Sequence, residues 1–228
     1  MKADTLPVNE IFETIQGEAG FTGTPAVFIR LQGCPVGCGW CDTKHTWHVD
    51  EKHRLEGLRP ILLKDRYVQT HGANSFAHLD IDTIMEGVQT FAARHVVITG
   101  GEPCLYDLRP LTERLVYEGC RPQVETSGTE EIRVHPATWV TVSPKIDMPG
   151  GRQVLESALI RANEIKFPVG KMEDIKKLQY QVADKVGHAT IWLQPLSQSN
   201  SATALCIEQA SINGWRVSFQ VHKFVGLR

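Results

Sequence analysis

Three cysteines fall within eight residues of this 228-residue chain, as Cys34, Cys38 and Cys41. A single loop with this spacing can surround one metal centre, and cysteine thiolates are the usual ligands of iron–sulfur clusters. Glycines at positions 33, 37 and 39 allow backbone N–H groups to approach the sulfides of such a cluster. Three thiolates for the four irons of a 4Fe-4S cluster leave one iron open. An open metal position is where a substrate or cofactor can bind and react.

A structural zinc site is the alternative interpretation of the same cysteines. His45 follows Cys41 after three residues and would complete a Cys3His set of ligands. Buried reduced thiols with no metal are a poorer interpretation, because three thiols among Pro and Gly make a poor apolar core segment. The spacing favours the iron–sulfur cluster and leaves the zinc site open.

A second motif, Gly100-Gly101-Glu102-Pro103, directly follows the strand-like residues 95–99. Together with the three-cysteine spacing, it resembles the radical S-adenosylmethionine superfamily. Residues 15–18, 28–34, 41–47, 142–145 and 193–195 resemble the 7-carboxy-7-deazaguanine synthase family more closely. The resemblance covers nearly the whole chain, with residues 48–78 as the stretch that lacks a clear counterpart. We interpret residues 48–78 as a variable insertion within a single domain of residues 1–228.

The resemblance implies a carbon–nitrogen lyase with a 4Fe-4S cluster, S-adenosylmethionine and Mg2+ as cofactors. In this family the reduced cluster passes one electron to the sulfonium, which gives a 5′-deoxyadenosyl radical. The radical removes a hydrogen from C6 of 6-carboxy-5,6,7,8-tetrahydropterin, the ring contracts and ammonia leaves. The product, 7-carboxy-7-deazaguanine, feeds queuosine biosynthesis. Because the radical arises at the cluster, the resemblance implies no protein acid or base as the catalytic residue.

The resemblance also assigns roles to individual residues. Cys34, Cys38 and Cys41 correspond to the cluster ligands, and Thr43 corresponds to a ligand of the magnesium ion shared with substrate. The S-adenosylmethionine site corresponds to Gly101, Ser143, Pro144, Lys145 and Gln194. The substrate site corresponds to Ile15, Gln16, Gly17, Glu18, Arg30 and Thr99.

Some of these residues have simpler interpretations. Arg30 lies in the strand-like segment 27–31, where a charge is seldom buried without a partner. Its guanidinium fork suits the substrate carboxylate, and an ion pair at a sheet edge is the alternative. The Thr43 hydroxyl could instead belong to a turn or helix cap, and Thr99 could reflect strand propensity alone. Ala19 stands where the family pattern predicts a glycine, and a positive φ there would be costly.

Strand-like and helix-like segments alternate along most of the chain. The patterns predict strands at 8–15, 26–31, 95–99, 122–126, 138–142, 163–167, 190–194 and 215–221. They predict helices at 81–91, 107–118, 151–161, 171–183 and 201–212, and at most short helical pieces within 48–78. This alternation indicates a mostly parallel sheet with ligands at the carboxyl ends of its strands. With the resemblance, it indicates a partial, incomplete parallel α/β barrel of the radical S-adenosylmethionine type.

Composition restricts the remaining possibilities. Lys and Arg total 24 and Asp and Glu total 26, so the chain has no overall basic field to hold nucleic acid. No apolar run approaches the roughly 18 residues of a membrane-spanning helix. The other three cysteines, at 104, 120 and 206, are isolated, which is typical of buried thiols in a reducing compartment. We expect a cytoplasmic enzyme that takes electrons from a reductase or flavodoxin-type protein, and the family resemblance implies a homodimer.

One rival enzyme class shares both motifs. A radical enzyme that activates a glycyl-radical partner protein would also carry the cysteine loop and the Gly-Gly-Glu-Pro turn. Such an enzyme needs no clamp for a substrate carboxylate, so Arg30 and Thr43 favour the small-molecule lyase. A zinc-stabilised interaction module without catalysis is the other alternative.

Overall fold

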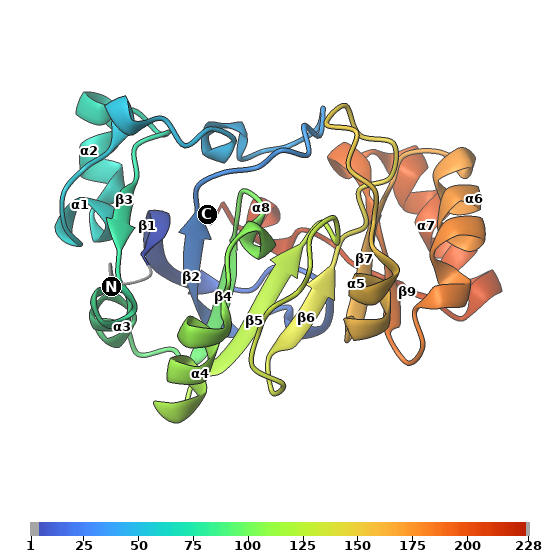
Figure 1. The fold of residues 1–228 in the computed structure, drawn as a ribbon. Coiled ribbons are helices and arrows are strands. Elements are labelled where there is room, and N and C mark those ends of the chain that lie inside the picture. Colours follow the sequence, from blue (N-terminus) through green and yellow to red (C-terminus); the bar gives the residue numbers. More distant parts are fainter. Residues whose placement is uncertain (1–4, 227–228) are drawn as a thin grey trace.

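The computed structural model describes residues 5–226, which form a single nine-stranded sheet covered by helices (Figure 1). In chain order the strands are β1 (Leu6–Ile15), β2 (Pro25–Leu31), β3 (Ala77–Leu79), β4 (His95–Gly100), β5 (Arg121–Thr126), β6 (Trp139–Val142), β7 (Glu164–Val169), β8 (Thr190–Pro195) and β9 (Arg216–Val217). Their order across the sheet is β3-β1-β2-β4-β5-β6-β7-β8-β9. β1 is antiparallel to β2 and β3, whereas the six pairs from β2–β4 to β8–β9 are parallel.

Helices connect most of the parallel strands, as the alternating pattern predicts, whereas β5 leads to β6 without one. They are α1 (Arg59–Leu62), α2 (Lys64–His71), α3 (Ile81–Gln89), α4 (Arg109–Tyr117), α5 (Glu156–Arg161), α6 (Met172–Gln181), α7 (Asn200–Asn213) and α8 (Val221–Phe224). The sheet does not close on itself, because β3 and β9 each pair with a neighbour on one side only. This open arrangement confirms the expected incomplete α/β barrel.

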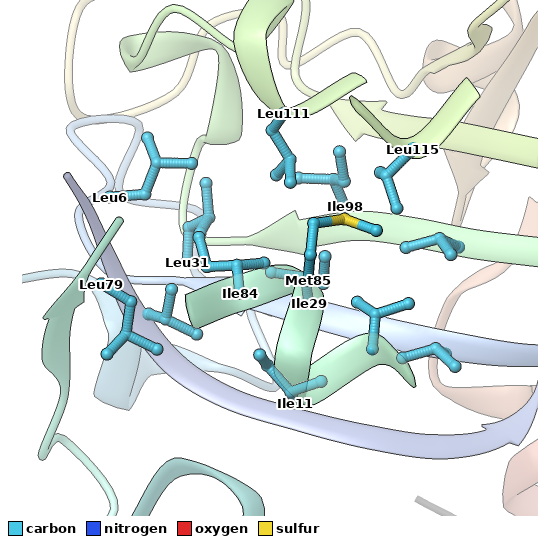
Figure 2. Packing of buried hydrophobic residues seen from close by; sticks show 14 of the residues in the cluster. Leu6, Ile11, Ile29, Leu31, Leu79, Ile84, Met85, Ile98, Leu111 and Leu115 are labelled. Carbon is cyan, nitrogen blue, oxygen red and sulfur yellow. The ribbon is translucent and has the colours of Figure 1, made fainter. Parts of the chain in front are cut away.

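The main core lies between the sheet and the helices α3 and α4 (Figure 2). Ile29 and Ile98 point from the strands toward Ile84, Met85 and the helix α4. On α3 the apolar residues recur at helical spacing, and Asp80 begins the helix by accepting a hydrogen bond from the backbone N of Thr83. A second apolar cluster joins β6, β7 and β8 to α5, α6 and α7.

The opposite face of the sheet carries polar side chains on β5 and β7, since successive strand residues point to opposite faces. On β5, Val124 belongs to the core, whereas Gln123 and Glu125 hydrogen-bond across the other face. On β7, Ile165 belongs to the core and Lys166 contacts Glu125. Buried polar side chains need partners, so this polar face marks where a site can be built.

Residues 48–78 pack closely against the rest of the domain. They contain α1 and α2, as the expected short helical pieces, and also the strand β3, which the sequence did not predict. Ile61 and Phe76 are fully buried, and the Lys64 ammonium donates to Ser75 Oγ (2.9 Å). Three residues are too few for a clear strand pattern, and β3 is recognisable only from its pairing with β1.

Two predicted elements differ from the structure. The predicted strand 215–221 is reduced to the two residues of β9, and the chain then turns into α8 at Val221. The predicted helix 151–161 begins only at Glu156, because the backbone before it hydrogen-bonds to other segments of the chain. Gly150 N donates to Val36 O (3.0 Å), and Leu155 N donates to Gly128 O (2.8 Å). Within residues 5–226, no helix has the length and apolarity required to cross a membrane.

Candidate active site

A cavity of about 640 Å3 opens at the carboxyl ends of the parallel strands and extends over the polar face of the sheet. Fourteen of the fifteen residues proposed from the sequence line it, from both ends of the chain and from the strands between. The exception is Pro144, which is buried between two lining residues, Ser143 and Lys145. The fold thus brings the proposed cluster, cofactor and substrate residues to one place.

The cysteine loop is held at the end of β2 by backbone hydrogen bonds. Gly33 N donates to Thr46 O (2.7 Å), and Cys34 N donates to Trp47 O (2.9 Å), which closes the loop on itself. The thiols of Cys34, Cys38 and Cys41 all line the cavity. Cys104, Cys120 and Cys206 are buried in the protein interior, as expected for structural thiols.

Cys34, Cys38 and Cys41 are the proposed ligands of the cluster. Within residues 5–226, no three His, Cys, Asp or Glu side chains lie close enough together to hold one metal ion. In a cluster each thiolate binds an iron of its own. Burial raises the pKa of Cys34 to about 11, with nearby negative charge from Glu102, Cys38 and Cys41 adding to the effect. Cationic iron is the kind of partner that would keep such thiols ionised.

Thr43 follows the last cysteine and precedes a short 3-10 helix, Lys44–Thr46. Its carbonyl oxygen accepts hydrogen bonds from the Thr46 backbone N (2.9 Å) and hydroxyl (2.8 Å). Its own hydroxyl makes no capping hydrogen bond and lies 3.6 Å from Cys41 Sγ. Because Thr43 lines the cavity, this hydroxyl is a suitable hard oxygen ligand for Mg2+.

The Gly-Gly-Glu-Pro turn packs directly against the cysteine loop. Gly101 N donates to Leu31 O (2.9 Å) and Glu102 N donates to Gly33 O (2.7 Å). A Cβ atom on Gly101 would lie 2.0 Å from Gly33 O, so only glycine allows this approach. The cluster loop and the cofactor turn are therefore positioned as one unit.

The Glu102 side chain joins this turn to the end of β5. It is 1% exposed and accepts hydrogen bonds from Thr126 Oγ1 (2.6 Å), Ser127 N (2.7 Å) and Cys104 N (2.9 Å). The Ser127 hydroxyl also donates to it. Glu102 thus fixes two adjacent strand ends at the edge of the cavity.

Apart from Gly101, the proposed S-adenosylmethionine residues lie directly after β6 and near the end of β8. Lys145 Nζ donates to Ser143 Oγ (2.6 Å), and burial lowers the pKa of Lys145 while the neighbouring Cys38 opposes that effect. Gln194 Nε2 donates to Glu18 Oε1 (3.3 Å), so Gln194 links the cofactor side of the cavity to the substrate loop.

Arg30 has a protein partner in the structure. Its Nε donates to Glu10 Oε1 (2.6 Å), its register partner on the neighbouring strand, and its guanidinium lies 5.6 Å from the centre of the Phe12 ring. β2 is an interior strand, so this ion pair is not at a sheet edge. Arg30 also lines the cavity, so its guanidinium combines this ion pair with a position at the candidate site.

Residues 15–18, proposed from the sequence as the substrate loop, enter the cavity from the end of β2 opposite the cysteines. β1 ends beside the amino ends of the parallel strands. Its last residue, Ile15, pairs with Pro25 at the start of β2, and the next residue of β2, Ala26, pairs with His95 at the start of β4. Gln16 is 2% exposed, and its Nε2 donates to Glu125 Oε1 (2.8 Å). The loop therefore folds up against the polar face of the sheet.

The C-terminal segment covers this loop, which the sequence did not predict. Val221 N donates to Gly17 O (2.9 Å), and Gln220 Nε2 donates to Glu18 Oε1 (2.7 Å). The His222 ring is so near that a Cβ on Gly17 would lie 2.2 Å from its Nδ1. Lys223 Nζ reaches Asp42 in the cysteine loop (3.2 Å). The segment after β9 thus forms a wall of the cavity.

Several polar residues of the cavity were not identified from the sequence. They are Glu102, Glu125, Lys166, Gln220 and His222. Glu125 and Lys166 alternate with apolar residues inside strands, and this period of two would have placed them on the face opposite the core. The cavity positions of Gln220 and His222 carry no such sequence signal.

Ala19 has the conformation that the family pattern assigns to glycine, with φ of 51°. It is 5% exposed, and its N–H donates to Ser218 Oγ (2.8 Å). Because the left-handed region costs a residue with a Cβ about 1–2 kcal/mol, Ala19 strains the substrate loop. The sequence departs from the pattern here, but the structure keeps the turn.

Relief of this strain is testable by Ala19→Gly. We expect the free energy of unfolding to rise by up to about 1 kcal/mol, since the greater flexibility of unfolded glycine offsets part of the gain. The measurement is urea unfolding of wild type and variant. Ala189→Gly, in a loop where φ is not positive, is the matched control and should lower stability by about 0.5–1 kcal/mol. Equal losses in both variants would show that Ala19 is unstrained.

Comparison with known proteins gives a consistent result. The chain is 52% identical over 223 residues to the 7-carboxy-7-deazaguanine synthase of Escherichia coli (strain K12), which covers 97% of this chain and 98% of the relative. The enzyme of the same name from Buchnera aphidicola subsp. Schizaphis graminum is 43% identical over 225 residues, with 97% and 99% covered. That from Flavobacterium psychrophilum is 32% identical over 232 residues, with 99% and 94% covered.

A solved structure agrees with these relatives. The crystal structure of QueE from Escherichia coli superposes with a TM-score of 0.86 at 51% sequence identity, and the match covers 96% of this chain and 95% of that one. No protein-family model matches the chain.

Proposed function

Because this chain belongs to the 7-carboxy-7-deazaguanine synthase family of radical S-adenosylmethionine enzymes, we propose that the cavity described above is where its reaction takes place. The activity is a radical-mediated ring contraction, in which a lyase of queuosine biosynthesis converts 6-carboxy-5,6,7,8-tetrahydropterin to 7-carboxy-7-deazaguanine and ammonia. The observation that carries the proposed site is the convergence of fourteen of the fifteen residues on one cavity. Relatives at 52% and 43% identity give no support to a glycyl-radical activating enzyme or a zinc module.

The cofactor side of the cavity lies at the carboxyl ends of the strands. When bound, the 4Fe-4S cluster and S-adenosylmethionine supply the electron transfer and the radical. Cys34, Cys38 and Cys41 hold the cluster. Gly101, Ser143, Pro144, Lys145 and Gln194 bind S-adenosylmethionine, with the glycine admitting close backbone approach and the lysine and hydroxyl meeting polar groups.

The substrate side lies on the polar face of the sheet. The terminal nitrogens of Arg30 bind the pterin carboxylate, while Glu10 holds the guanidinium in place through Nε. Gln16 and Glu18 offer amide and carboxylate groups to the N–H-bearing edge of the pterin, and Ile15, Gly17 and Thr99 complete the surface. Burial between these two sides keeps water from the reacting carbon.

The assignment is tested by reconstituting the cluster without oxygen and supplying the tetrahydropterin, S-adenosylmethionine, Mg2+ and dithionite. We expect 7-carboxy-7-deazaguanine, identified by mass spectrometry, with ammonia released in equal amount. A protein with an intact cluster spectrum that forms no deazaguanine would overturn the assignment. The family's metal requirement is tested separately through Thr43.

Replacing Thr43 by Ala removes the proposed magnesium ligand. We expect the Mg2+ concentration for half-maximal activity to rise about 10- to 100-fold, the usual effect of disturbing a metal site. The measurement is the rate of product formation against Mg2+ concentration. Thr70→Ala, on exposed α2, is the control and should leave the titration unchanged. Identical titrations for Thr43→Ala and wild type would exclude this hydroxyl as a ligand.

We also propose that an electron-donating protein docks beside the cysteine loop and that the enzyme is a homodimer. Trp40, between two of the cysteines, is 47% exposed and gives the donor an apolar contact close to the cluster. Phe219, Phe224 and Val225 near the C-terminus are exposed apolar residues that support a protein interface. Sedimentation of the purified enzyme tests the dimer.

A further inference from the structure

Lys166 is a buried lysine that lines the cavity, and the proposed function gives it no role. It comes from β7, and its ammonium contacts two carboxylates that lie far apart in the sequence. Lys166 Nζ donates to Glu125 Oε2 (2.7 Å) and to Glu18 Oε2. The side chains of Lys166, Glu18 and Glu125 are 8%, 12% and 19% exposed. All three residues line the cavity.

We propose that Lys166 is a positioning residue, which holds Glu18 and Glu125 together as a fixed, ionised pair of hydrogen-bond acceptors facing the substrate. This inference rests on the proposed function, in which Glu18 meets the N–H-bearing edge of the pterin. Two carboxylates that share one cation leave a net negative charge on that wall. Such a wall favours a ligand that presents adjacent N–H donors.

Side chains from several elements hold the Glu18 carboxylate in position. Gln194 on β8 and Gln220 after β9 both donate to its Oε1, at 3.3 and 2.7 Å. Gln16 donates to the other oxygen of Glu125, so the second carboxylate is also held from two sides. Because both carboxylates are fixed before ligand arrives, little ordering is needed on binding.

The charges around the pair explain why Lys166 is the decisive cation. Burial raises the pKa of Glu18, but the Lys166 ammonium and its hydrogen bond outweigh burial and hold the value at about 2. His222 from α8 lowers it further. Lys145 after β6 is the other cation facing Glu18 and Lys166, and burial lowers its pKa. Glu125 from β5 is the second carboxylate that faces Lys166, and Glu164, two residues before Lys166 on β7, accepts a hydrogen bond from Gly20 N (3.1 Å).

A contribution to the stability of the folded protein does not by itself explain Lys166. Burying three charges carries a desolvation cost that a well-packed apolar group avoids. Removing only the cation leaves two adjacent buried carboxylates, which cannot both stay ionised and so take up a proton at higher pH. A change in the pH dependence of catalysis is therefore the signature of a positioning role.

The experiment compares the reconstituted enzyme with Lys166→Met, with Lys176→Met as the matched surface control, because Lys176 is exposed on α6. In Lys166→Met the acid limb of kcat/KM against pH should move upward into the assay range, a shift of about three pH units. At neutral pH its kcat/KM for the tetrahydropterin should fall about 100-fold. Wild type and Lys176→Met should keep the acid limb below the assay range, since the Lys166 ammonium holds the pKa of Glu18 well below its usual range.

Two further variants keep the test decisive. Lys166→Arg retains the charge and should restore the wild-type acid limb. Lys166→Gln keeps a hydrogen-bond donor without the charge and should show the same upward shift of the acid limb as Lys166→Met. It also replaces Lys166→Met in the test if that variant fails to fold. Iron content and the cluster absorption spectrum report correct folding in each variant. A normal acid limb in folded Lys166→Gln would overturn the inference while wild type still forms product. Absence of product from wild type would instead overturn the proposed function.

Discussion

Replacing Cys38 by Ala should abolish product formation, because the 4Fe-4S cluster would lose one of its three proposed protein ligands. Cys38 is 8% exposed and lies in the middle of a loop that backbone hydrogen bonds hold at the end of β2. Nearby negative charge from Cys41 raises its pKa further above the value set by burial, while Lys145 opposes this. In the variant two thiols remain, and neither can replace the missing one without moving the loop.

Iron and sulfide analysis after anaerobic reconstitution measures this directly, together with product formation. Cys120→Ala is the matched control, because Cys120 is buried at the start of β5, away from the cavity lining. We expect wild-type iron content in Cys120→Ala and less than a full cluster in Cys38→Ala. If Cys38→Ala retained a full cluster and made product, the three-cysteine assignment would be wrong.

Most of the sheet could be predicted because its strands and the helices between them show clear patterns of apolar residues. The apolar run of β4 and the helical spacing on α3 identify both elements without tertiary information. β3 was not predictable in the same way, and β9 was predicted only as part of a longer strand, 215–221. With three and two residues, they exist only through pairing with longer strands that precede them by many residues.

The site was predictable where its residues occur in short motifs. The cysteine loop and the Gly-Gly-Glu-Pro turn are each continuous in sequence, so their residues could be assigned together. The contact of Lys166 with Glu18 joins residues 148 apart, and that of Gln220 with Glu18 joins residues 202 apart. No local pattern encodes such contacts, which follow from the fold bringing β7 and the C-terminal segment over the substrate loop.

The acceptor of the Arg30 guanidinium could not be decided from the sequence alone. A buried guanidinium in a strand requires an acceptor, and the substrate carboxylate and an ion pair both satisfy that requirement. The structure supplies Glu10, directly across the β1–β2 ladder. Because Arg30 pairs with Glu10 and also lines the cavity, the two roles are compatible, and the ion pair would fix the orientation in which the guanidinium meets a ligand.

Replacing Glu102 by Ala should cost the folded protein about 3 kcal/mol, because two buried backbone N–H groups lose their acceptor. These are Cys104 N and Ser127 N, which lie 2.9 and 2.7 Å from the carboxylate oxygens. The hydroxyls of Thr126 and Ser127 lose the same acceptor but have other contacts, with Gly128 N and Thr129. Urea unfolding of the cluster-free protein measures the change without interference from metal binding.

The same substitution should lower product formation about 100-fold, since Glu102 fixes the turn that carries Gly101 against the cysteine loop and a displacement near 1 Å has that effect. Glu102→Gln separates shape from charge. Its carbonyl oxygen can still accept one backbone hydrogen bond, so it should lose about half as much stability as Glu102→Ala. Equal stability of wild type and Glu102→Ala would show that backbone contacts to Leu31 and Gly33 alone hold the turn. The turn, and with it the cofactor side of the cavity, would then be independent of β5.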